Sequence, residues 1–219
     1  MKTSPASRLD LEREALARGR HPLAGVDEAG RGPLAGPVVA AAVVFPVEWL
    51  LDAWPAALAD LNDSKQLSAD RREHYFDFLV AHPQVRHGIG RVEAPGIDVL
   101  NILQATHQAM NEALRALRPR PAHALVDGRP VPGLLVGHTA VVRGDARSYS
   151  IAAASVLAKV TRDRLMVEAD QAWPGYGFAQ HKGYPTPEHL AALARLGPCP
   201  LHRRSFAPLR PPDPDLFSP

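Results

Sequence analysis

Two adjacent carboxylates, Asp27 and Glu28, stand between an apolar run and a glycine-rich stretch that reads Ala-Gly-Arg-Gly-Pro-Leu-Ala-Gly-Pro. A pair of carboxylates is costly to remove from water unless a positive group binds it, and divalent cations prefer oxygen ligands. The pair therefore indicates a cation site at which chemistry takes place. The alternative is a solvated turn in which both side chains only accept hydrogen bonds from nearby backbone N–H groups.

Two further carboxylates occupy comparable places in the chain. Asp127 follows the short apolar run 122–126, and Asp145 lies in a glycine-containing turn between an expected strand and an expected helix. Neighbouring strands lie about 5 Å apart, so the four carboxylates would converge if their strands share one sheet edge. Four such groups cannot all ionise at close range without cations, and two Mg²⁺ or Mn²⁺ ions would neutralise them. A two-metal site of this kind suits phosphodiester hydrolysis.

Side-chain nucleophiles are the competing chemistry, and the sequence disfavours them. No histidine lies at a local spacing that makes a Ser-His pair with Ser64, Ser148, Ser150 or Ser155, which we expect to cap helices and fill the core. The ten histidines show no metal-ligand spacing. The single cysteine, Cys199, excludes an internal disulfide and a cysteine-based zinc site, and we expect it to be a small buried side chain.

The hydrophobic pattern predicts which elements position these residues. Strands are expected at residues 23–26, 38–45, 85–92, 122–126 and, more weakly, 134–142, and helices at 8–18, 68–82, 97–117 and 148–169. Ser68 is the expected cap of one helix, and Ser148 or Ser150 of another, whereas residues 49–61 read as an irregular linker. This order predicts an α/β fold with a mixed central β-sheet flanked by helices, followed by a helical or irregular C-terminal lobe.

The overall composition sets further limits. The 219 residues suffice for one substantial core, and a net charge of +2 permits nucleic-acid binding without requiring it. A basic cluster near the C-terminus reads as a solvated surface; its members are Lys182, His202, Arg203, Arg204 and Arg210. No apolar run approaches the roughly 18 residues of a membrane span, and no signal-peptide core is present. We therefore expect a cytoplasmic protein with no membrane contact.

Six segments of the chain resemble bacterial ribonuclease HII in sequence and in order. They are residues 25–37, 62–65, 101–106, 126–128, 144–145 with 151–160, and 177–184, and the resemblance spans roughly residues 22–207. It implies a ribonuclease H-like fold and cleavage of the RNA strand of RNA–DNA hybrids, including a single ribonucleotide embedded in duplex DNA. It also implies that water attacks on the 5′ side of the ribonucleotide and leaves 3′-hydroxyl and 5′-phosphate ends.

The resemblance assigns a role to each matching position. Asp27, Glu28, Asp127 and Asp145 would be the catalytic carboxylates that bind Mg²⁺ or Mn²⁺. Four domain parts follow: an N-terminal extension (1–21), a ribonuclease H-like catalytic domain (22–172), a C-terminal substrate-binding lobe (173–207) and a flexible Pro-rich tail (208–219).

Substrate recognition is implied for a second group of residues. Gly30, Arg31 and Gly32 would approach the ribose at the RNA–DNA junction, with Arg31 on the adjacent phosphate, and Tyr184 would pack on the sugar of the following deoxynucleotide. Elementary chemistry agrees, because only glycine lets the main chain come close enough to bind a 2′-hydroxyl, and an aromatic face tests sugar shape by contact.

Several basic residues also fit the family pattern. Lys65 and Lys182 are expected to contact the substrate, and Lys159 to contact a phosphate or to support the structure. Arg143 departs from the pattern, because the family commonly has lysine before Gly-Asp. A guanidinium beside Asp145 keeps the charge but not the geometry of an ammonium, which puts any fine positioning role in doubt.

The sequence disfavours three other interpretations. Ribonuclease HIII shares the fold but carries an extra N-terminal domain, for which the roughly 21 residues before the first expected strand leave no room. Ribonuclease HI lacks an Asp-Glu pair followed by Gly-Arg-Gly. A hybrid-binding module without catalysis should lack some of the acidic set, which this chain retains.

The expected partners are an RNA–DNA hybrid or a DNA duplex with an embedded ribonucleotide, bound by a monomer. A weak contact with the replication sliding clamp is a further expectation, because residues 213–217, Asp-Pro-Asp-Leu-Phe, loosely resemble clamp-docking peptides. An unstructured end is the alternative for this segment.

Overall fold

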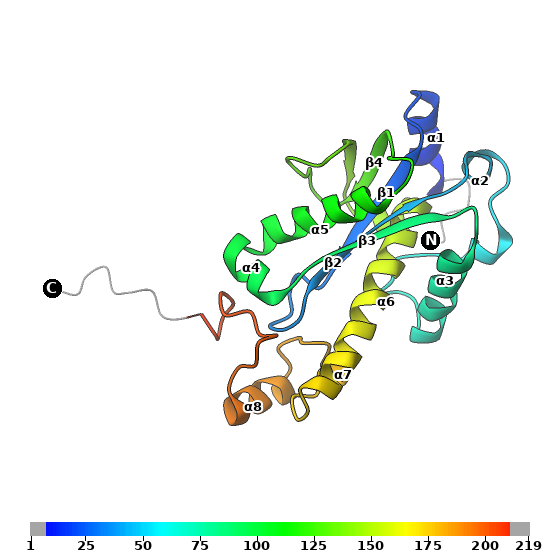
Figure 1. The fold of residues 1–219 in the computed structure, drawn as a ribbon. Coiled ribbons are helices and arrows are strands. Elements are labelled where there is room, and N and C mark those ends of the chain that lie inside the picture. Colours follow the sequence, from blue (N-terminus) through cyan, green and yellow to red (C-terminus); the bar gives the residue numbers. More distant parts are fainter. Residues whose placement is uncertain (1–7, 211–219) are drawn as a thin grey trace.

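A five-stranded mixed β-sheet forms the centre of the protein (Figure 1). The computed structural model describes residues 8–210. The strand order is β3 (Arg86–Val92), β2 (Val38–Val44), β1 (Leu23–Ala29), β4 (His123–Asp127) and β5 (Gly137–Val141). Strand β2 runs antiparallel to both of its neighbours, β3 and β1, whereas β1, β4 and β5 run parallel to one another. The predicted α/β fold with a mixed sheet is confirmed.

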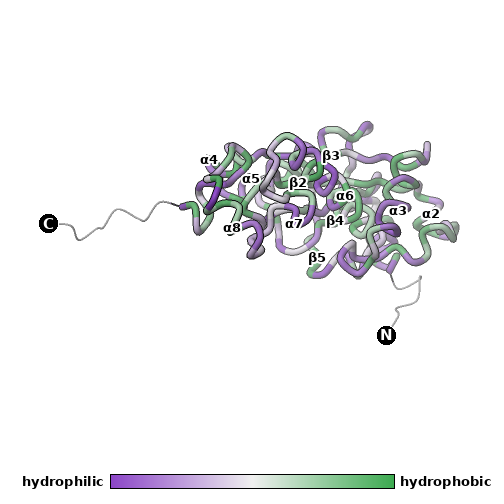
Figure 2. The backbone as a smooth tube through the Cα atoms, turned by 90° about the horizontal axis from the view of Figure 1, so that it is seen from below, coloured by the Kyte–Doolittle hydropathy of each residue, from purple (hydrophilic) through white to green (hydrophobic). Residues whose placement is uncertain are grey.

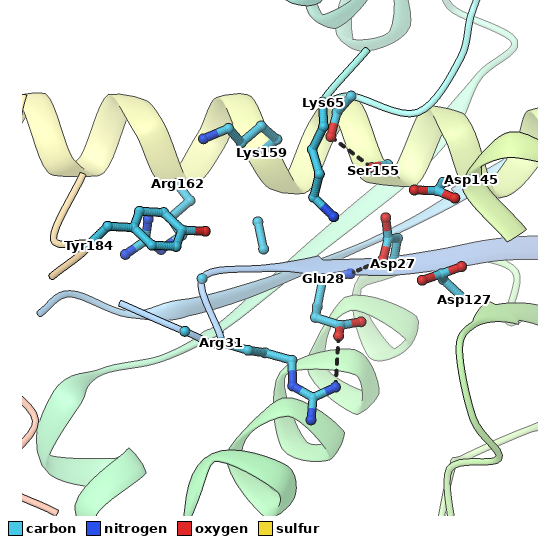
Figure 3. Close-up of a pocket in the computed structure, with 14 residues that line it drawn as sticks. Asp27, Glu28, Arg31, Lys65, Asp127, Asp145, Ser155, Lys159, Arg162 and Tyr184 are labelled. Atoms are coloured by element: carbon cyan, nitrogen blue, oxygen red, sulfur yellow. Dashed lines mark hydrogen bonds and ion pairs between the residues drawn. The ribbon is translucent and has the colours of Figure 1, made fainter. Parts of the chain in front are cut away.

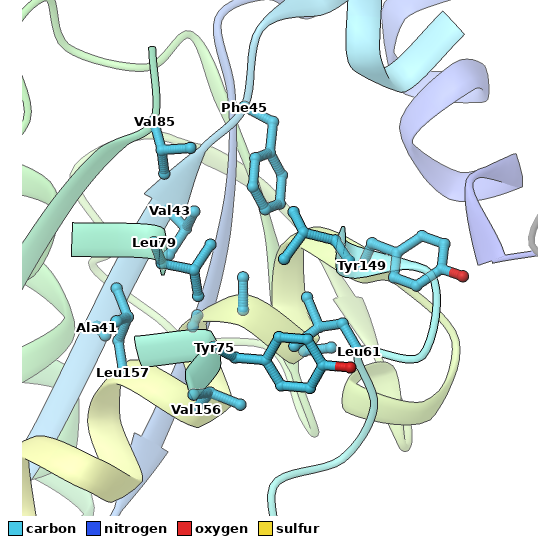
Figure 4. Close-up of a cluster of buried hydrophobic side chains, with 14 of the residues drawn as sticks. Ala41, Val43, Phe45, Leu61, Tyr75, Leu79, Val85, Tyr149, Val156 and Leu157 are labelled. Atoms are coloured by element: carbon cyan, nitrogen blue, oxygen red, sulfur yellow. The ribbon is translucent and has the colours of Figure 1, made fainter. Parts of the chain in front are cut away.

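Helices cover both faces of this sheet (Figure 1). On one face lie α4 (Ala94–Leu100) and α5 (Ile102–Ala116), and on the other α3 (Ala69–Ala81) and the long α6 (Tyr149–Ala172). Successive side chains of a strand point to opposite faces, so Ala40 and Ala42 of β2 pack under α5 while Ala41 and Val43 pack under α3 and α6. Figure 4 shows the second of these cores, with Leu157 of α6 among its side chains.

The remaining elements lie at the two ends of the molecule. Near the N-terminus are α1 (Asp10–Ala17), α2 (Val47–Leu51) and the 3₁₀ turn η2 (Ala56–Leu58). Past the 3₁₀ turn η3 (Gly144–Ala146) and α6, the chain forms α7 (Phe178–His181) and α8 (Pro187–Leu196). Figure 2 places α4 and α8 at one end and α2 and α3 at the other. Among the described residues, no helix is long and apolar enough to cross a membrane.

Side-chain caps explain where the predicted helices begin. The hydroxyl of Ser68 accepts a hydrogen bond from the Arg71 N–H, and the hydroxyl of Ser148 accepts one from the Ile151 N–H. Of the two candidate caps of α6, the structure therefore selects Ser148.

Three expectations about elements were wrong. The helix expected at 97–117 is broken at Asn101, whose backbone is left-handed (φ 67°) and whose side chain caps α5. Residues 49–61 contain most of α2 and all of η2 instead of an irregular linker. The first strand continues to Ala29 because Asp27, Glu28 and Ala29 still pair with β2, so the acidic pair lies within a strand and not in a turn.

Close packing of β1 on α6 fixes the position of the acidic strand. A Cβ atom at Gly25 would lie 2.1 Å from the Ser150 carbonyl carbon, so no other residue lets the two elements approach this closely. The first turn of α6 is also held by α1, because the buried carboxylate of Glu12 accepts hydrogen bonds from the Ser148 hydroxyl (2.6 Å) and the Ser150 N–H (3.0 Å). The strand that carries Asp27 thus has little freedom to move relative to α6.

Candidate active site

The structure brings the four predicted carboxylates to one end of the sheet. Val26 of β1 pairs with Val126 of β4, so Asp27 and Asp127, each one residue further on, lie at the same level. Asp145 follows β5 in η3, and Glu28 succeeds Asp27. All four line one cavity of about 330 Å³ (Figure 3).

Asp27 is the most deeply placed of the four. Its side chain faces α6, whereas Glu28, the next residue of the strand, points to the opposite side of the cavity (Figure 3). Only 6% of Asp27 is exposed, and one of its carboxylate oxygens accepts the Glu28 N–H at 2.7 Å. Burial raises the pKa of Asp27 well above its usual range, and the negative charges of Glu28 and Asp127 raise it further.

The other carboxylates are each held by a donor. Glu28 pairs with Arg31 at 3.2 Å, and burial still raises the pKa of Glu28. Asp127 accepts the Gly144 N–H at 2.6 Å, which ties β4 to η3. Asp145 accepts the N–H of the next residue at 2.9 Å. Burial, followed by the negative charges of Asp63 and Asp127, raises the pKa of Asp145 to about 6.

The donor set of this cavity fits a hard divalent cation. Its acidic side chains offer oxygen atoms alone, which divalent cations prefer. Burial, together with the charges of neighbouring carboxylates, raises the pKa of Asp27, Glu28 and Asp145, so ionising them together is costly without a cation. As placed here, no three acidic, histidine or cysteine side chains of residues 8–210 lie close enough together to hold one ion. The hydrogen bonds to backbone N–H groups and to Arg31 occupy part of the carboxylate oxygens instead.

The predicted recognition residues line the same cavity. Gly30, Arg31, Gly32 and Tyr184 all contribute to its wall (Figure 3). A Cβ atom at Gly32 would lie 3.8 Å from the Tyr184 ring, so the glycine leaves a narrow gap between the main chain and the aromatic face. Tyr184 is 43% exposed, and the Arg162 guanidinium lies 5.9 Å from the ring centroid.

The basic residues named by the resemblance occupy different positions. Lys65 and Lys159 line the cavity, and Lys159 pairs with Asp163 at 2.7 Å. Lys182 does not line it, and its ammonium donates to the Ala179 carbonyl. Arg143 is exposed and left-handed (φ 54°).

Sequence reasoning missed Arg162, which lines the cavity. Ser155 and Lys159 line it too, and the three residues follow one another at spacings of four and three on α6, which places them on one helix face. This spacing is the signal that would have found Arg162. Ser155 contacts Ser64 at 2.9 Å, in keeping with the packing role expected for both.

Two members of the basic C-terminal cluster are buried, so the expectation of a solvated surface was wrong for these two. Arg203 is fully buried and His202 is 2% exposed. The partners of Arg203 are backbone carbonyls, which no sequence pattern reveals, so charge alone suggested exposure.

A chain of hydrogen bonds runs through this buried region to Tyr184. The Tyr184 carbonyl only accepts, so the Nδ1 of His189 carries a proton (2.9 Å), and the Nε2 of His189 accepts from the Nε2–H of His202 (3.1 Å). The Nδ1 of His202 then accepts the Cys199 N–H at 3.1 Å. Both rings are neutral in this arrangement, and burial lowers the pKa of His189 and lowers that of His202 to about 4. Cys199 is buried, as expected.

Comparison with known proteins shows to which family the chain belongs. The sequence profile of the ribonuclease HII family matches residues 24–209. This chain belongs to the ribonuclease HII family. Ribonuclease HII of Citrifermentans bemidjiense is 50% identical over 204 residues, which cover 93% of this chain and 85% of that protein. The resemblance seen in the six segments is confirmed, and the chain is a ribonuclease H, which acts on RNA–DNA hybrids.

Solved structures give the same result for the fold. Ribonuclease H2 of Pyrococcus horikoshii has a TM-score of 0.71 and 28% identity, covering 86% of this chain and 95% of that one. A complex of PCNA with ribonuclease HII from Archaeoglobus fulgidus gives 0.63 and 26%, covering 79% and 87%. A Bst ribonuclease HIII in complex with Mn²⁺ gives 0.59 and 17%, covering 85% and 67%, which shows the shared fold alone. The ribonuclease H-like fold is thereby confirmed.

The raised pKa of Asp145 predicts that the site destabilises the metal-free enzyme. A folded-state pKa of about 6, above the ordinary 3.8, means that this group's stabilising contribution is complete below pH 3.8 and is lost as the pH rises through 6. We therefore expect Asp145→Asn, which keeps the acceptor oxygen, to raise the melting temperature in EDTA at about pH 8 by about 2–4 °C.

Thermal unfolding at two pH values checks this expectation. The gain should shrink at about pH 4, where the parent carboxyl is largely protonated. Asp52→Asn, at an exposed position, is the matched control and should leave the melting temperature unchanged at both. A lower melting temperature for Asp145→Asn at pH 8 would contradict the account.

Proposed function

We propose that the enzyme hydrolyses the phosphodiester on the 5′ side of a ribonucleotide, both in RNA–DNA hybrids and at a single ribonucleotide embedded in duplex DNA. The products would carry 3′-hydroxyl and 5′-phosphate ends. One observation carries the proposal: a single cavity is lined by Asp27, Glu28, Asp127 and Asp145 and also by Gly30–Gly32 with Tyr184. Groups suited to cleavage thus lie beside groups suited to reading a sugar.

The four carboxylates are the residues proposed to hold Mg²⁺ or Mn²⁺. Divalent ions supply a nucleophilic water and stabilise the charge that develops on the leaving oxygen. The structure of a ribonuclease HIII with Mn²⁺ supports this choice of cation. Glu28 would exchange its contact with Arg31 for the cation, and Arg31, whose side chain is 49% exposed, would then bind a substrate phosphate.

The opposite wall of the cavity is proposed to select RNA. Gly32 lets the main chain approach a 2′-hydroxyl, the group that distinguishes RNA from DNA, and Tyr184 offers an exposed aromatic face to the neighbouring sugar. Lys65 and Lys159 supply positive charge for the adjacent phosphates. Lys182 lies outside the cavity and stays a predicted contact to a more distant phosphate.

The proposed reaction is tested on a duplex that contains one ribonucleotide. With Mg²⁺ or Mn²⁺, the parent should cut it once on the 5′ side and leave an all-DNA duplex intact. Asp127→Asn should lose at least ~100-fold in rate, because several kcal/mol of charge stabilisation disappear. Asp52→Asn should cut like the parent. An uncut duplex with the parent, or full activity of Asp127→Asn, would overturn the proposal.

Gly32→Ala separates recognition from cleavage chemistry. The new methyl group meets only an ordinary 3.8 Å contact and the Gly32 backbone is not left-handed, so the protein should fold normally. The methyl would fill the gap in front of Tyr184, and we expect kcat/KM on the embedded-ribonucleotide duplex to fall about tenfold or more.

Calorimetric Mn²⁺ affinity should stay at the parent value in Gly32→Ala, since no carboxylate moves. Gly137→Ala, with a comparable 3.4 Å contact on the edge strand β5, is the matched control and should keep parent activity. Parent-like kcat/KM in Gly32→Ala would remove the glycine from substrate recognition.

We also propose that residues 213–217 contact the replication sliding clamp. The segment lies outside the described residues, and the PCNA complex of the Archaeoglobus fulgidus relative supports the proposal. Immobilised clamp should retain the full chain but not a chain that lacks residues 213–219. Equal retention of both would favour an unstructured end without this role.

A further inference from the structure

Two buried arginines contact the loop that forms one wall of the cavity. Arg162 is 1% exposed and Arg203 is 0% exposed. Neither forms an ion pair within the described part of the chain, 8–210. Because an unpaired buried charge is costly, the remaining contacts of each guanidinium must account for its place in the fold.

Arg203 donates to three carbonyls of the segment that follows β1. Its Nη2 lies 2.6 Å from the Gly30 oxygen, and its Nη1 lies 3.0 Å from the Arg31 oxygen. The Nε and Nη2 atoms reach the Gly36 oxygen at 3.0 and 2.8 Å. The planar guanidinium thus holds both ends of the Gly30–Gly36 loop at once, which a single ammonium cannot do.

Arg162 supports the same loop from α6. Its Nε donates to the Pro37 carbonyl at 2.9 Å, and its Nη2 donates to the carbonyls of Ala35 (3.1 Å) and Lys182 (3.0 Å). A Cβ atom at Gly30 would lie 2.0 Å from the Arg162 Nε, so the loop rests directly on this side chain. The carbonyl of Lys182 links the loop to the turn that precedes Tyr184.

These contacts determine where the loop's N–H groups point. The peptide bonds 30–31 and 31–32 are trans, so each carbonyl points away from the N–H of the residue that follows. With the carbonyls of Gly30 and Arg31 directed at Arg203, the N–H groups of Arg31 and Gly32 point away from it. Neither N–H has an acceptor among residues 8–210, and both residues line the cavity.

The charge of Arg203 persists at neutral pH. Burial, followed by the charge of Arg162, lowers the pKa of Arg203 to about 9, while the carboxylate of Asp98 acts in the opposite direction. Asp98 itself is hydrogen-bonded to the N–H groups of Arg204 and Ser205. Two cations that form no ion pair among residues 8–210 therefore support the loop, and their positive charge favours a substrate phosphate at this wall.

We propose that Arg203, together with Arg162, is a positioning residue for substrate selection. The two guanidinium groups hold the carbonyls of the Gly30–Gly36 loop and of Pro37, which follows it. They thereby direct the free N–H groups of Arg31 and Gly32 at the ribose and its phosphate. The inference rests on the proposed function of this cavity. In this arrangement the choice of cleavage site depends on Arg203, a residue of the C-terminal lobe that does not itself contact the substrate.

Arg203→Lys and Arg162→Lys test the proposal, because lysine keeps the charge but cannot bridge several carbonyls. On the single-ribonucleotide duplex, kcat/KM should fall about tenfold or more. On a duplex with a short run of ribonucleotides, cuts should spread over positions that the parent leaves intact. The position of the cuts does not depend on the fraction of folded enzyme, so a loss of stability alone would not change it.

Arg195→Lys is the matched control, since this exposed arginine of the same lobe also donates to a carbonyl, that of Gly175. It should keep the parent cleavage pattern, and calorimetric Mn²⁺ affinity should be unchanged in all three variants. Parent-like rates and cut positions in both Arg203→Lys and Arg162→Lys would overturn the inference. Failure of the proposed function is recognised separately, because the parent itself would then leave the duplex intact.

Discussion

Repulsion among carboxylates at a poorly solvated sheet end is the constraint on which the rest of this structure depends. Asp27 is nearly inaccessible to water, and the two charges that raise its pKa, those of Glu28 and Asp127, have the same sign as its own. No local interaction among these three carboxylates would bring them together. The antiparallel pairing with β2, the parallel pairing with β4 and the close approach to α6 at Gly25 hold the acidic strand in place. The stability of the whole core thus supports a locally unfavourable site.

The opposite wall of the cavity carries the opposite charge. Arg162 and Arg203 lie behind the glycine-containing loop, while the carboxylates lie at the strand ends, so the two walls differ in potential over a short distance. A nucleic-acid strand brings one phosphate whose charge must be neutralised for cleavage. Its adjacent phosphates need only be bound. Because the acidic and the basic groups lie on different walls, one cavity can cleave one phosphodiester and bind the adjacent phosphates.

The sequence allowed prediction of the features that depend on a local residue pattern, namely strand ends and helix caps. Asp27 and Asp127 both follow short apolar runs, so they could be expected to converge if their strands share one sheet edge. Ser68 was recognisable as a cap, whereas Ser148 and Ser150 were both candidates for the cap of the long helix. The break at Asn101 could not be predicted, because the apolar residues keep their helical spacing on both sides of it. The positive φ of this asparagine does not change that spacing. The burial of Arg203 was beyond reach, because its partners are carbonyls brought together only by the fold. The roles of individual residues rest on their match to the family motifs.

The hydrogen bonds of the histidine chain behind Tyr184 all donate in the same direction, from the Cys199 N–H toward the Tyr184 carbonyl. A carbonyl at one end of the chain and an N–H at the other fix the tautomer of both rings. A proton added to His189 would place two hydrogens between the two Nε2 atoms, and one added to His202 would place two between its Nδ1 and the Cys199 nitrogen. Across the neutral range the aromatic platform is therefore insensitive to proton concentration. The Tyr184 carbonyl is the last acceptor of this chain, so the turn that presents the aromatic ring is tied to two helix and loop residues of the lobe as long as both rings stay neutral.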